Sequence, residues 1–372
     1  MGEVANRIGR LSVAQRTLLE MRLTELGLDK AMRAPPRSDS MKTLARNTVI
    51  ADSFSDAGRD FPTVVHAPAP RADLIGWIEK NRAWLEDALQ KSGAILVREF
   101  LIEGPTAFEQ CIEQAWGAST DYPGFTQSVA LRKHVSGKIY TSTEYSPAFR
   151  IHLHNECAFA NTWPAQICFF CVTAPSSGGE TPIADSRRVL ERISQTTLSR
   201  LLERGILYVR NFSYGSSRSW ERAFGTTDKA RVEEICRAER VACEWLDDSR
   251  LRTRAVRPPV ARHPTTGEPV WFNHINASHI SSLEPDLRNA LLAEFQPEDL
   301  PRNCYYGDGS EIEHSVIEEI RHAYEAETVT FDWKPGDLLM ADNMLTAHGR
   351  HPFTGEREIL VGMAGSIQRA DD

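Results

Sequence analysis

A series of short, strand-like segments separated by turn-forming residues restricts the possible fold of this chain. The segments are rich in β-branched and aromatic residues and are bounded by Gly, Pro, Asn and Asp. Short strands of this kind, with helical patterns between them, favour a β-sandwich or jelly-roll core decorated by helices. The strand-like segments are 166–172, 205–212, 252–260, 270–273, 328–333, 337–343 and 358–365.

The N-terminal half of the chain adds helical patterns. An amphipathic pattern over 74–89 precedes a strand-like segment over 94–100, and a second helical pattern follows over 105–116. An earlier helix is predicted over 11–27, because Ser12 and Gln15 form a capping box and Gly27 can end it. We therefore expect an N-terminal helical segment over 1–33, a Pro- and Ser-rich linker over 34–62, and a single domain over 63–372.

Composition excludes several classes of protein. The chain has 43 basic and 51 acidic residues among 372, a net charge of -8, which gives no general attraction to nucleic acid or to anionic lipid. It begins without the apolar run of a secretory signal and holds no run of membrane-spanning length, so we expect a cytoplasmic protein. Its seven cysteines are scattered and odd in number, which argues against a disulfide framework. Cys168 and Cys171 are predicted to be core residues of a strand.

Three residues form a pattern typical of a metal site. His154 and Glu156 are one residue apart, and successive side chains of a strand alternate between its faces, so we expect both to project the same way. His348, near the C-terminus, can complete one face of an octahedral iron. Two histidines and one carboxylate leave three coordination positions open, which suits a metal that binds a bidentate cosubstrate and dioxygen together.

Each of these metal-ligand segments is followed by a group that can bind an oxyanion. Thr181 lies in GGETPIADS, after Glu156, and Arg357 lies in HGRHPFTGER, after His348. A keto acid that chelates a metal through its C1 carboxylate leaves a second carboxylate, which a guanidinium and a hydroxyl can hold. Arg350 is an alternative to Arg357 for this role.

The remaining histidines and a basic run have weaker interpretations. His152 is the one rival metal ligand, and His351 is expected to point elsewhere. His263, Asn273 and His274 are predicted to be structural or to line a substrate site, and Asn155 is expected to make a structural hydrogen bond. Arg252 and Arg254, in the basic run LRTRAVRPPVAR, belong either to a solvated strand face or to a site that binds a substrate carboxylate or phosphate.

The order of the motifs resembles that of a known family. HNE, GGETPIADS, RNF, HPTTGEPVWFN, YGDGS, GDLLMADN and AHGRHPFTGER follow one another as in TauD/TfdA-like dioxygenases. The resemblance is strongest to the SyrP-like branch, whose members hydroxylate amino acids in nonribosomal peptide biosynthesis, and it spans roughly 94–363. It implies a double-stranded β-helix (a cupin-like jelly roll), Fe(II) held by His154, Glu156 and His348, and 2-oxoglutarate and O₂ as cosubstrates. It assigns the 2-oxoglutarate contacts to Thr181 and Arg357.

The resemblance also predicts the chemistry. Related halogenases have a small residue where this chain has Glu156, so hydroxylation is expected, with desaturation and epoxidation as alternatives. The expected substrate is an aminoacyl group on a carrier protein, modified at the β-carbon, with a free amino acid or peptide as the alternative. The helix over 11–27 is similar to helices that precede condensation modules of peptide synthetases, and we expect it to dock such a partner or to fold back on its own domain.

Two other classes of function remain open from sequence. A catalytically silent binding protein could keep the fold, although it would have no need for an open metal site. A metal-dependent hydrolase would use the same ligand types, but it would leave Thr181 and Arg357 without a purpose.

Overall fold

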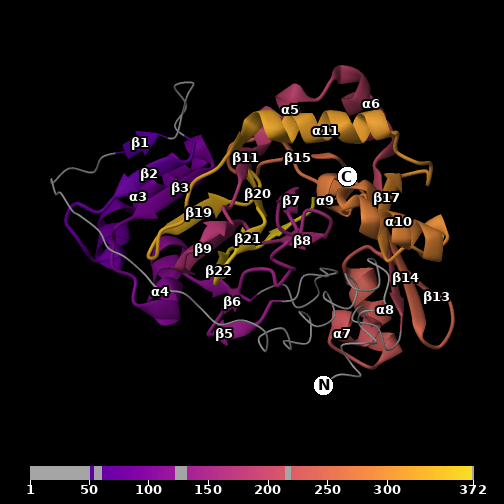
Figure 1. Cartoon of the computed structure of the whole chain (residues 1–372), viewed down its shortest axis with the longest axis horizontal. Coiled ribbons are helices and arrows are strands. Elements are labelled where there is room, and N and C mark those ends of the chain that lie inside the picture. The colour runs from indigo at the N-terminus through magenta and orange to yellow at the C-terminus, as the bar shows by residue number, and fades with distance from the viewer. Residues whose placement is uncertain (1–50, 54–60, 122–131, 214–218, 371–372) are drawn as a thin grey trace.

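A computed structural model describes residues 51–53, 61–121, 132–213 and 219–370. The N-terminal helical segment expected over 1–33 and most of the expected linker over 34–62 lie outside these residues. In the described part, two β-sheets form the layers of a jelly-roll core, and helices pack around them (Figure 1). This architecture confirms the predicted fold class.

The larger sheet contains four of the eight strands that the sequence patterns predict, namely β3, β9, β19 and β22. Its order is β1-β2-β3-β19-β9-β22-β6-β5, and β4 pairs with β22. Neighbouring strands are antiparallel except β2 and β3, which are parallel. The bounds are β1 Ala51–Ser53, β2 Thr63–His66, β3 Ala94–Arg98, β4 Ser119–Thr120, β5 His134–Ser136, β6 Ile139–Thr141, β9 Gln166–Thr173, β19 Leu338–Asp342 and β22 Glu358–Ala364.

The smaller sheet has the order β18-β11-β20-β7 and carries the candidate metal ligands. Its strands are β7 Ile151–His154, β11 Ile183–Asp185, β18 Thr328–Val329 and β20 Thr346–Arg350. The predicted strand over 328–333 is therefore much shorter than expected. His348 pairs with Ile183 on one side and with His154 on the other, so the register of this sheet brings the two histidines together.

Apolar side chains fill the space between the two sheets and the outer face of the larger one. Phe169 of β9 packs with Ile183 of β11 in the core between the sheets. On the outer face lie α3 (Leu74–Ser92) and α4 (Gly104–Trp116), which confirm the two helices predicted there. Asp73 caps α3 by accepting from two backbone N–H groups, and Gly93 ends it with φ of 83°.

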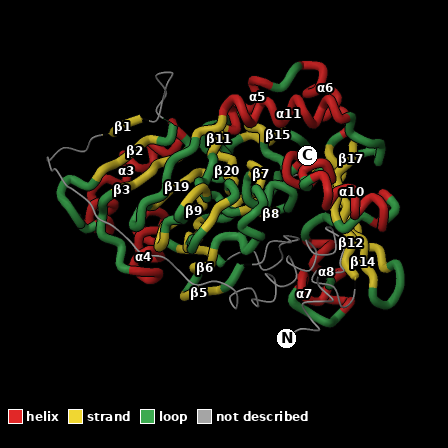
Figure 2. Tube along the Cα trace, viewed as in Figure 1, coloured by secondary structure: helices red, strands yellow, loops and turns green. Residues whose placement is uncertain are grey.

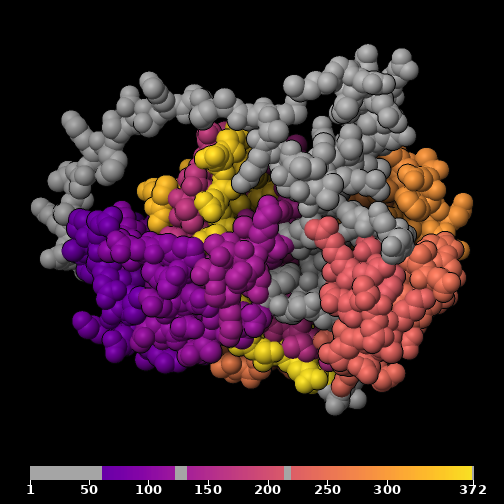
Figure 3. Space-filling view, turned by 90° about the horizontal axis from the view of Figure 1, so that it is seen from below, coloured from indigo at the N-terminus to yellow at the C-terminus, as the bar shows by residue number. Residues whose placement is uncertain are grey.

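A third sheet and further helices form a lobe beside the jelly roll. Its order is β13-β14-β12-β17, and α7 and α8 pack on it (Figures 1 and 2). In the space-filling view the part of this lobe from α7 to β14 is salmon and lies apart from the indigo and purple N-terminal elements (Figure 3). Its elements are α7 Trp220–Phe224, α8 Lys229–Ala238, β12 Ile206–Ser213, β13 Ala242–Trp245, β14 Arg250–Arg257 and β17 Arg302–Tyr306.

The remaining elements connect these layers. The predicted strand over 252–260 is divided, because β14 ends at Arg257 and a separate short strand begins at Val260. The elements that connect the layers are α5 Ser186–Arg192, α6 Gln195–Arg204, α9 Ile275–Ser278, α10 Pro285–Glu294, α11 His314–Glu327, η2 Ile280–Ser282, η3 Pro297–Asp299, β8 Thr162–Trp163, β10 Ser177–Gly178, β15 Val260–Arg262, β16 Pro269–Trp271, β21 Phe353–Thr354 and β23 Ile367–Gln368.

Two predictions from composition can be compared with this fold. All seven cysteines are free, and Cys168 and Cys171 are buried in β9, which confirms that they are core residues. Within the described ranges, no helix combines the length and the apolar character that crossing a membrane requires.

Candidate active site

The three candidate metal ligands converge at one edge of the smaller sheet. Ligand atoms of His154, Glu156 and His348 all lie within 4.8 Å of one another. The two histidines are register partners on β7 and β20, with ring centroids 4.7 Å apart. Gly349 permits this approach, because a Cβ there would lie 2.6 Å from the Ile151 carbonyl oxygen of β7.

Glu156 reaches this position by a route that differs from the one predicted. Strand β7 ends at His154, and Glu156 lies in the following turn, where Cys157 has φ of 58°. Strand alternation therefore does not align Glu156 with His154. The turn is held by Asn343, whose side chain accepts from the Glu156 N–H (2.7 Å) and donates to the Glu156 carbonyl (2.9 Å).

Asn155, between the two ligands, has the structural role that the sequence predicts. Its side-chain amide donates to the Asn343 carbonyl (2.7 Å) and to the Ser186 hydroxyl (3.1 Å). The amide is fully buried, so these bonds fix the backbone between His154 and Glu156.

His154 is oriented to present one nitrogen to a metal. Its Nδ1 lies 2.8 Å from the His152 carbonyl oxygen, which can only accept, so Nδ1 carries the proton and Nε2 keeps its lone pair. Burial, reinforced by the neighbouring His348, lowers the pKa of His154 to about 4. The imidazole is therefore neutral near pH 7, the form that binds metals.

Glu156 is buried and paired with an arginine that sequence reasoning did not identify. Burial alone would raise the pKa of Glu156, but Arg132 and the two histidines outweigh it and hold the pKa well below its usual value. Arg132 donates to Glu156 Oε2 at 2.6 Å, and both side chains are almost completely buried. The carboxylate is therefore ionised and ready to act as a ligand.

These observations fit a divalent iron. A neutral imidazole nitrogen and an ionised carboxylate are available on one side, and His348 Nε2 lies 3.7 Å from Glu156 Oε2. His348 Nδ1 is buried without a hydrogen-bond partner among the described residues. Two histidines and one carboxylate on one face are the donor set of iron oxygenases that keep coordination positions open.

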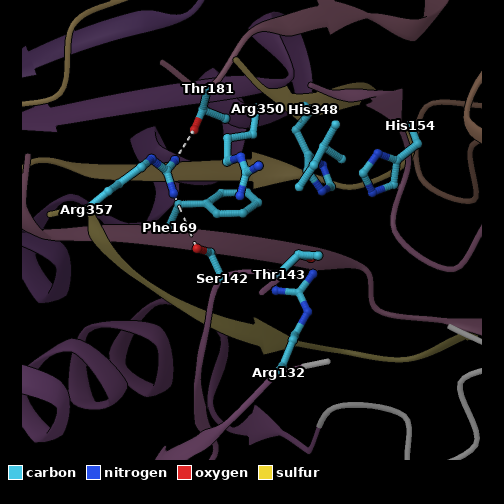
Figure 4. A pocket seen from close by; sticks show the side chains of 11 residues that line it. Arg132, Ser142, Thr143, His154, Phe169, Thr181, His348, Arg350 and Arg357 are labelled. Atoms are coloured by element: carbon cyan, nitrogen blue, oxygen red, sulfur yellow. Dashed lines mark hydrogen bonds between the residues drawn. The ribbon is translucent and has the colours of Figure 1, made fainter. Parts of the chain in front are cut away.

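Arg357 and Thr181 lie together at the other end of the same pocket (Figure 4). Arg357 Nε donates to the Gly179 carbonyl (2.9 Å), and its two Nη atoms approach Ser142 Oγ (3.3 Å) and Thr181 Oγ1 (3.4 Å). Burial lowers the pKa of Arg357 to about 10, so the guanidinium stays charged near pH 7. The end of the pocket therefore offers a cation to an oxyanion.

The hydroxyl of Thr181 is arranged to donate. Its oxygen accepts from Trp333 Nε1 (3.0 Å) and from Arg357, which uses both of its lone pairs. Its own hydrogen remains for a bound carboxylate oxygen. Arg357 and Thr181 together can hold the distal carboxylate of a keto acid.

Arg350, the alternative to Arg357, has a different environment. Its guanidinium donates to three backbone carbonyls, those of Tyr145, Ser146 and Phe149, at 2.6–2.9 Å. Burial lowers its pKa to about 9. With its donors directed at this loop, Arg350 holds the wall of the pocket, whereas Arg357 faces its interior.

The two arginines predicted from the basic run do not reach this pocket. Arg252 donates to Asn211 Oδ1 (2.8 Å) and Asp299 (2.7 Å), and Arg254 pairs with Glu244. The structure thus gives both arginines partners elsewhere on the third sheet and does not bring them to the metal ligands.

The predicted polar residues of the segment 263–274 divide into two groups. His263 pairs with Asp342 (3.0 Å), and Asn273 bonds to the backbone at Pro259 and Ile275, so both are structural. His274 instead packs edge-on against His154, with ring centroids 4.9 Å apart. It is the one member of this segment that touches a candidate metal ligand.

The other two histidines also have partners outside the metal set. His152 Nε2 lies 2.9 Å from the Ser282 carbonyl, and His351 Nδ1 lies 3.0 Å from Glu180. Neither side chain belongs to the group formed by His154, Glu156 and His348.

Sequence reasoning missed Arg132, Ser142 and Asn343. Arg132 precedes a short exposed strand and has no pattern that marks it. Asn343 ends GDLLMADN, a motif whose position directly after a buried strand was a usable signal for a turn-holding amide.

Comparison with known proteins gives a consistent result. The family model described as taurine catabolism dioxygenase TauD, TfdA family, matches residues 60–364. The dapdiamide synthesis protein DdaC of Enterobacter agglomerans is 40% identical over 283 residues, which are 76% of this chain and 85% of DdaC. A clavaminate synthase-like protein of Arabidopsis thaliana is 28% identical, over 82% of this chain and 94% of its own.

Among solved structures, PvcB of Pseudomonas aeruginosa has the same fold. It superposes with a TM-score of 0.51 and 16% identity, covering 88% of this chain and 94% of PvcB. PvcB is described as an iron- and α-ketoglutarate-dependent oxygenase.

Proposed function

The chain belongs to the TauD/TfdA family and is an Fe(II)- and 2-oxoglutarate-dependent oxygenase, and we propose that it hydroxylates an amino acid at the β-carbon. In its most specific form, the proposal places the amino acid on a carrier protein as an aminoacyl group. The naming of the relative DdaC for dapdiamide synthesis supports a biosynthetic role. A free amino acid or peptide is the alternative substrate.

The observation that carries the proposal is the meeting of two groups of residues in one pocket. His154 and His348 line one end, with Glu156 beside them, and Thr181 and Arg357 line the other. A 2-oxoglutarate molecule between these ends would direct its keto acid group to the metal ligands and its distal carboxylate to Arg357.

Bound iron and 2-oxoglutarate supply the activation of O₂, through which one oxygen atom enters a substrate C–H bond while 2-oxoglutarate becomes succinate and CO₂. The residues of the chain orient this reaction. His154 is held in one tautomer by the His152 carbonyl, and Arg357 with Thr181 fixes the cosubstrate at its far end. Because Glu156 fills the third ligand position, no position is left for a halide, which favours hydroxylation over halogenation.

The first test uses the whole protein with Fe(II), 2-oxoglutarate and O₂ and a carrier domain loaded with a panel of amino acids, beside the same free amino acids. Intact-protein mass spectrometry should show the gain of one oxygen on a carrier-bound residue and none in a His348→Ala control. Gain on free amino acids alone would contradict carrier tethering. Loss of two hydrogens would indicate desaturation instead, and oxygen gain across a double bond would indicate epoxidation.

A second test separates an oxygenase from a silent binding protein of the same fold. Anaerobic addition of 2-oxoglutarate to the Fe(II)-loaded protein should produce a visible charge-transfer band, because the keto acid chelates iron through two adjacent open positions. Absence of the band in a protein that binds Fe(II) would contradict the proposed function.

A further inference from the structure

Two arginines lie directly opposite each other on neighbouring strands of the third sheet. Arg210 of β12 and Arg302 of β17 are register partners in an antiparallel pair, so their side chains lie on the same face. Like charges in this arrangement destabilise a sheet. A ligand of opposite charge bound by both side chains would offset this repulsion.

The environment of the two arginines does not supply that opposite charge to Arg302. Within the described ranges, the side chain of Arg302 donates no hydrogen bond and makes no ion pair. Its electrostatic neighbours include the Tyr145 phenol, the Cys304 thiol and His274. Burial lowers its pKa. Arg302 is half-buried, and a guanidinium held partly out of water without a carboxylate partner carries a cost.

Arg210 is more deeply buried, and a series of side-chain contacts connects it to the candidate metal ligands. Its side chain is 6% exposed, and its guanidinium lies 4.5 Å from the centre of the Phe159 ring. Phe159 packs against His274 (5.1 Å between ring centroids), and His274 packs against His154 (4.9 Å). A short chain of contacts thus connects the arginine pair to a candidate metal ligand.

The arrangement of elements supports the same neighbourhood. Helix α9, which begins directly after His274, contacts both β7 and β17 (Figure 1). The His274 N–H donates to the Tyr208 hydroxyl (2.7 Å) on the same face of β12 as Arg210. His274 is therefore fixed between the sheet that carries the arginines and the strand that carries His154.

We propose that Arg210 and Arg302 bind a carboxylate of the substrate and so hold the reacting carbon beside the metal. The proposal rests on the oxygenase function proposed above and names the substrate class: a molecule whose carboxylate lies a few bonds from the carbon that is oxidised. Paired guanidinium groups suit a carboxylate because each offers several N–H donors in one plane.

The carboxylate has two possible sources. It is the α-carboxylate if the substrate is a free amino acid, and the side-chain carboxylate if the substrate is an acidic aminoacyl group whose α-carboxyl forms the carrier thioester. The phosphate of a long carrier arm fits less well, because the contacts from Arg210 to His154 are too short to span such an arm.

The binding site can be tested without iron or turnover. Arg357 also offers a cation to carboxylates, so the starting protein is metal-free Arg357→Gln, and every variant below is made in it. Replacing chloride by acetate at constant ionic strength should raise its melting temperature by roughly 1–3 °C, as expected for weak binding to the folded state. Arg250→Met, which alters an exposed arginine of β14 paired with Asp247, should keep this rise. Arg302→Met and Arg210→Met should lose it.

Stability provides a second readout that a structural arginine would not give. Arg302→Met should raise the melting temperature in chloride, because it removes the like-charge pair while keeping the aliphatic volume. A lower melting temperature, or an acetate effect that survives in Arg302→Met, would overturn the proposal. Arg302→Lys, which keeps the charge, covers the case in which the Met variant does not fold and should weaken the acetate effect without removing it.

Substrate analogues then distinguish the two sources once turnover is observed. Loss of turnover when a free amino acid is replaced by its amide assigns the α-carboxylate. Loss when carrier-bound aspartate is replaced by carrier-bound asparagine assigns the side-chain carboxylate. Turnover unaffected by either change, in a protein that forms the Fe(II)–2-oxoglutarate band, would overturn the carboxylate site while leaving the oxygenase function intact.

Discussion

Substitution distinguishes Arg357, which the sequence assigns to the cosubstrate, from Arg350, the alternative that it offers for the same role. Arg357 directs its two Nη atoms to Ser142 and Thr181 at the end of the pocket. Arg350 donates hydrogen bonds to three backbone carbonyls. Replacing each by Gln should therefore affect different properties, cosubstrate affinity in the first case and folding stability in the second.

The size of the effect follows from the number of hydrogen bonds lost. A charge-assisted hydrogen bond contributes about 1.5–3 kcal/mol, so losing two from the 2-oxoglutarate carboxylate in Arg357→Gln should cost about 3–6 kcal/mol, or roughly a hundredfold to ten-thousandfold in affinity. Arg350→Gln loses three bonds that hold the loop 145–149, which should lower the free energy of unfolding by about 3 kcal/mol or more.

The assay is anaerobic titration of the Fe(II)-loaded variants with 2-oxoglutarate, followed through the visible band, together with urea unfolding of the metal-free proteins. Arg357→Lys is the matched control, because it keeps the charge and loses the fork, and it should fall between wild type and Arg357→Gln. If Arg350→Gln weakens 2-oxoglutarate binding more than Arg357→Gln while both variants remain folded, the assignment of Arg357 is wrong.

Three further predictions concern buried or half-buried polar residues. Asn343→Ala removes two hydrogen bonds to the Glu156 backbone, so urea unfolding should show a decrease of about 2–3 kcal/mol in the free energy of unfolding. Calorimetry should show a weaker affinity for Mn(II), and an unchanged affinity would mean that Asn343 does not position Glu156. Arg132→Met removes the main cation that opposes the effect of burial on the pKa of Glu156, so Mn(II) binding should be lost at a higher pH than in wild type, and coinciding pH profiles would contradict this. Burial lowers the folded-state pKa of His279 to about 4, below the usual value near 6.5. The unfolded chain therefore binds a proton first, so the free energy of unfolding is highest above about pH 6.5 and decreases as the pH falls toward 4. His279→Gln should make this decrease shallower, and an identical slope would refute the prediction.

The larger sheet could be predicted from sequence because its strands are apolar. Segments such as 166–172 and 358–365 are bounded by turns and are rich in apolar residues that favour a buried strand, and they became β9 and β22. The helices over 74–89 and 105–116 were equally clear, because their apolar residues recur with helical spacing.

The smaller sheet was predicted only in part, through the segment that became β18 and the strand expected at His154, and the reason is chemical. Strands β7 (IHLH) and β20 (TAHGR) carry ligands and small residues in place of an apolar pattern. The identities of His154, Glu156 and His348 were nevertheless evident from their residue types and order. Their geometry depends on the β7–β20 register and on Asn343, which lies far from Glu156 in sequence, so no local pattern could reveal it.

The arginines illustrate a similar limit. The basic run drew attention to Arg252 and Arg254, which the structure pairs with acidic or amide side chains. Arg210 and Arg302 lie in separate segments and become neighbours only through the pairing of β12 with β17. Charge density along the chain was therefore a poor guide to which cations lie near the metal ligands.

The most direct measurement is a crystal structure of the protein grown anaerobically with Fe(II) and 2-oxoglutarate, with diffraction recorded at the iron edge. The account predicts one anomalous peak bound by His154, Glu156 and His348, with the distal carboxylate of 2-oxoglutarate on Arg357 and Thr181. An iron peak that lacks Glu156 as a ligand, or 2-oxoglutarate held by Arg350 in place of Arg357, would contradict it.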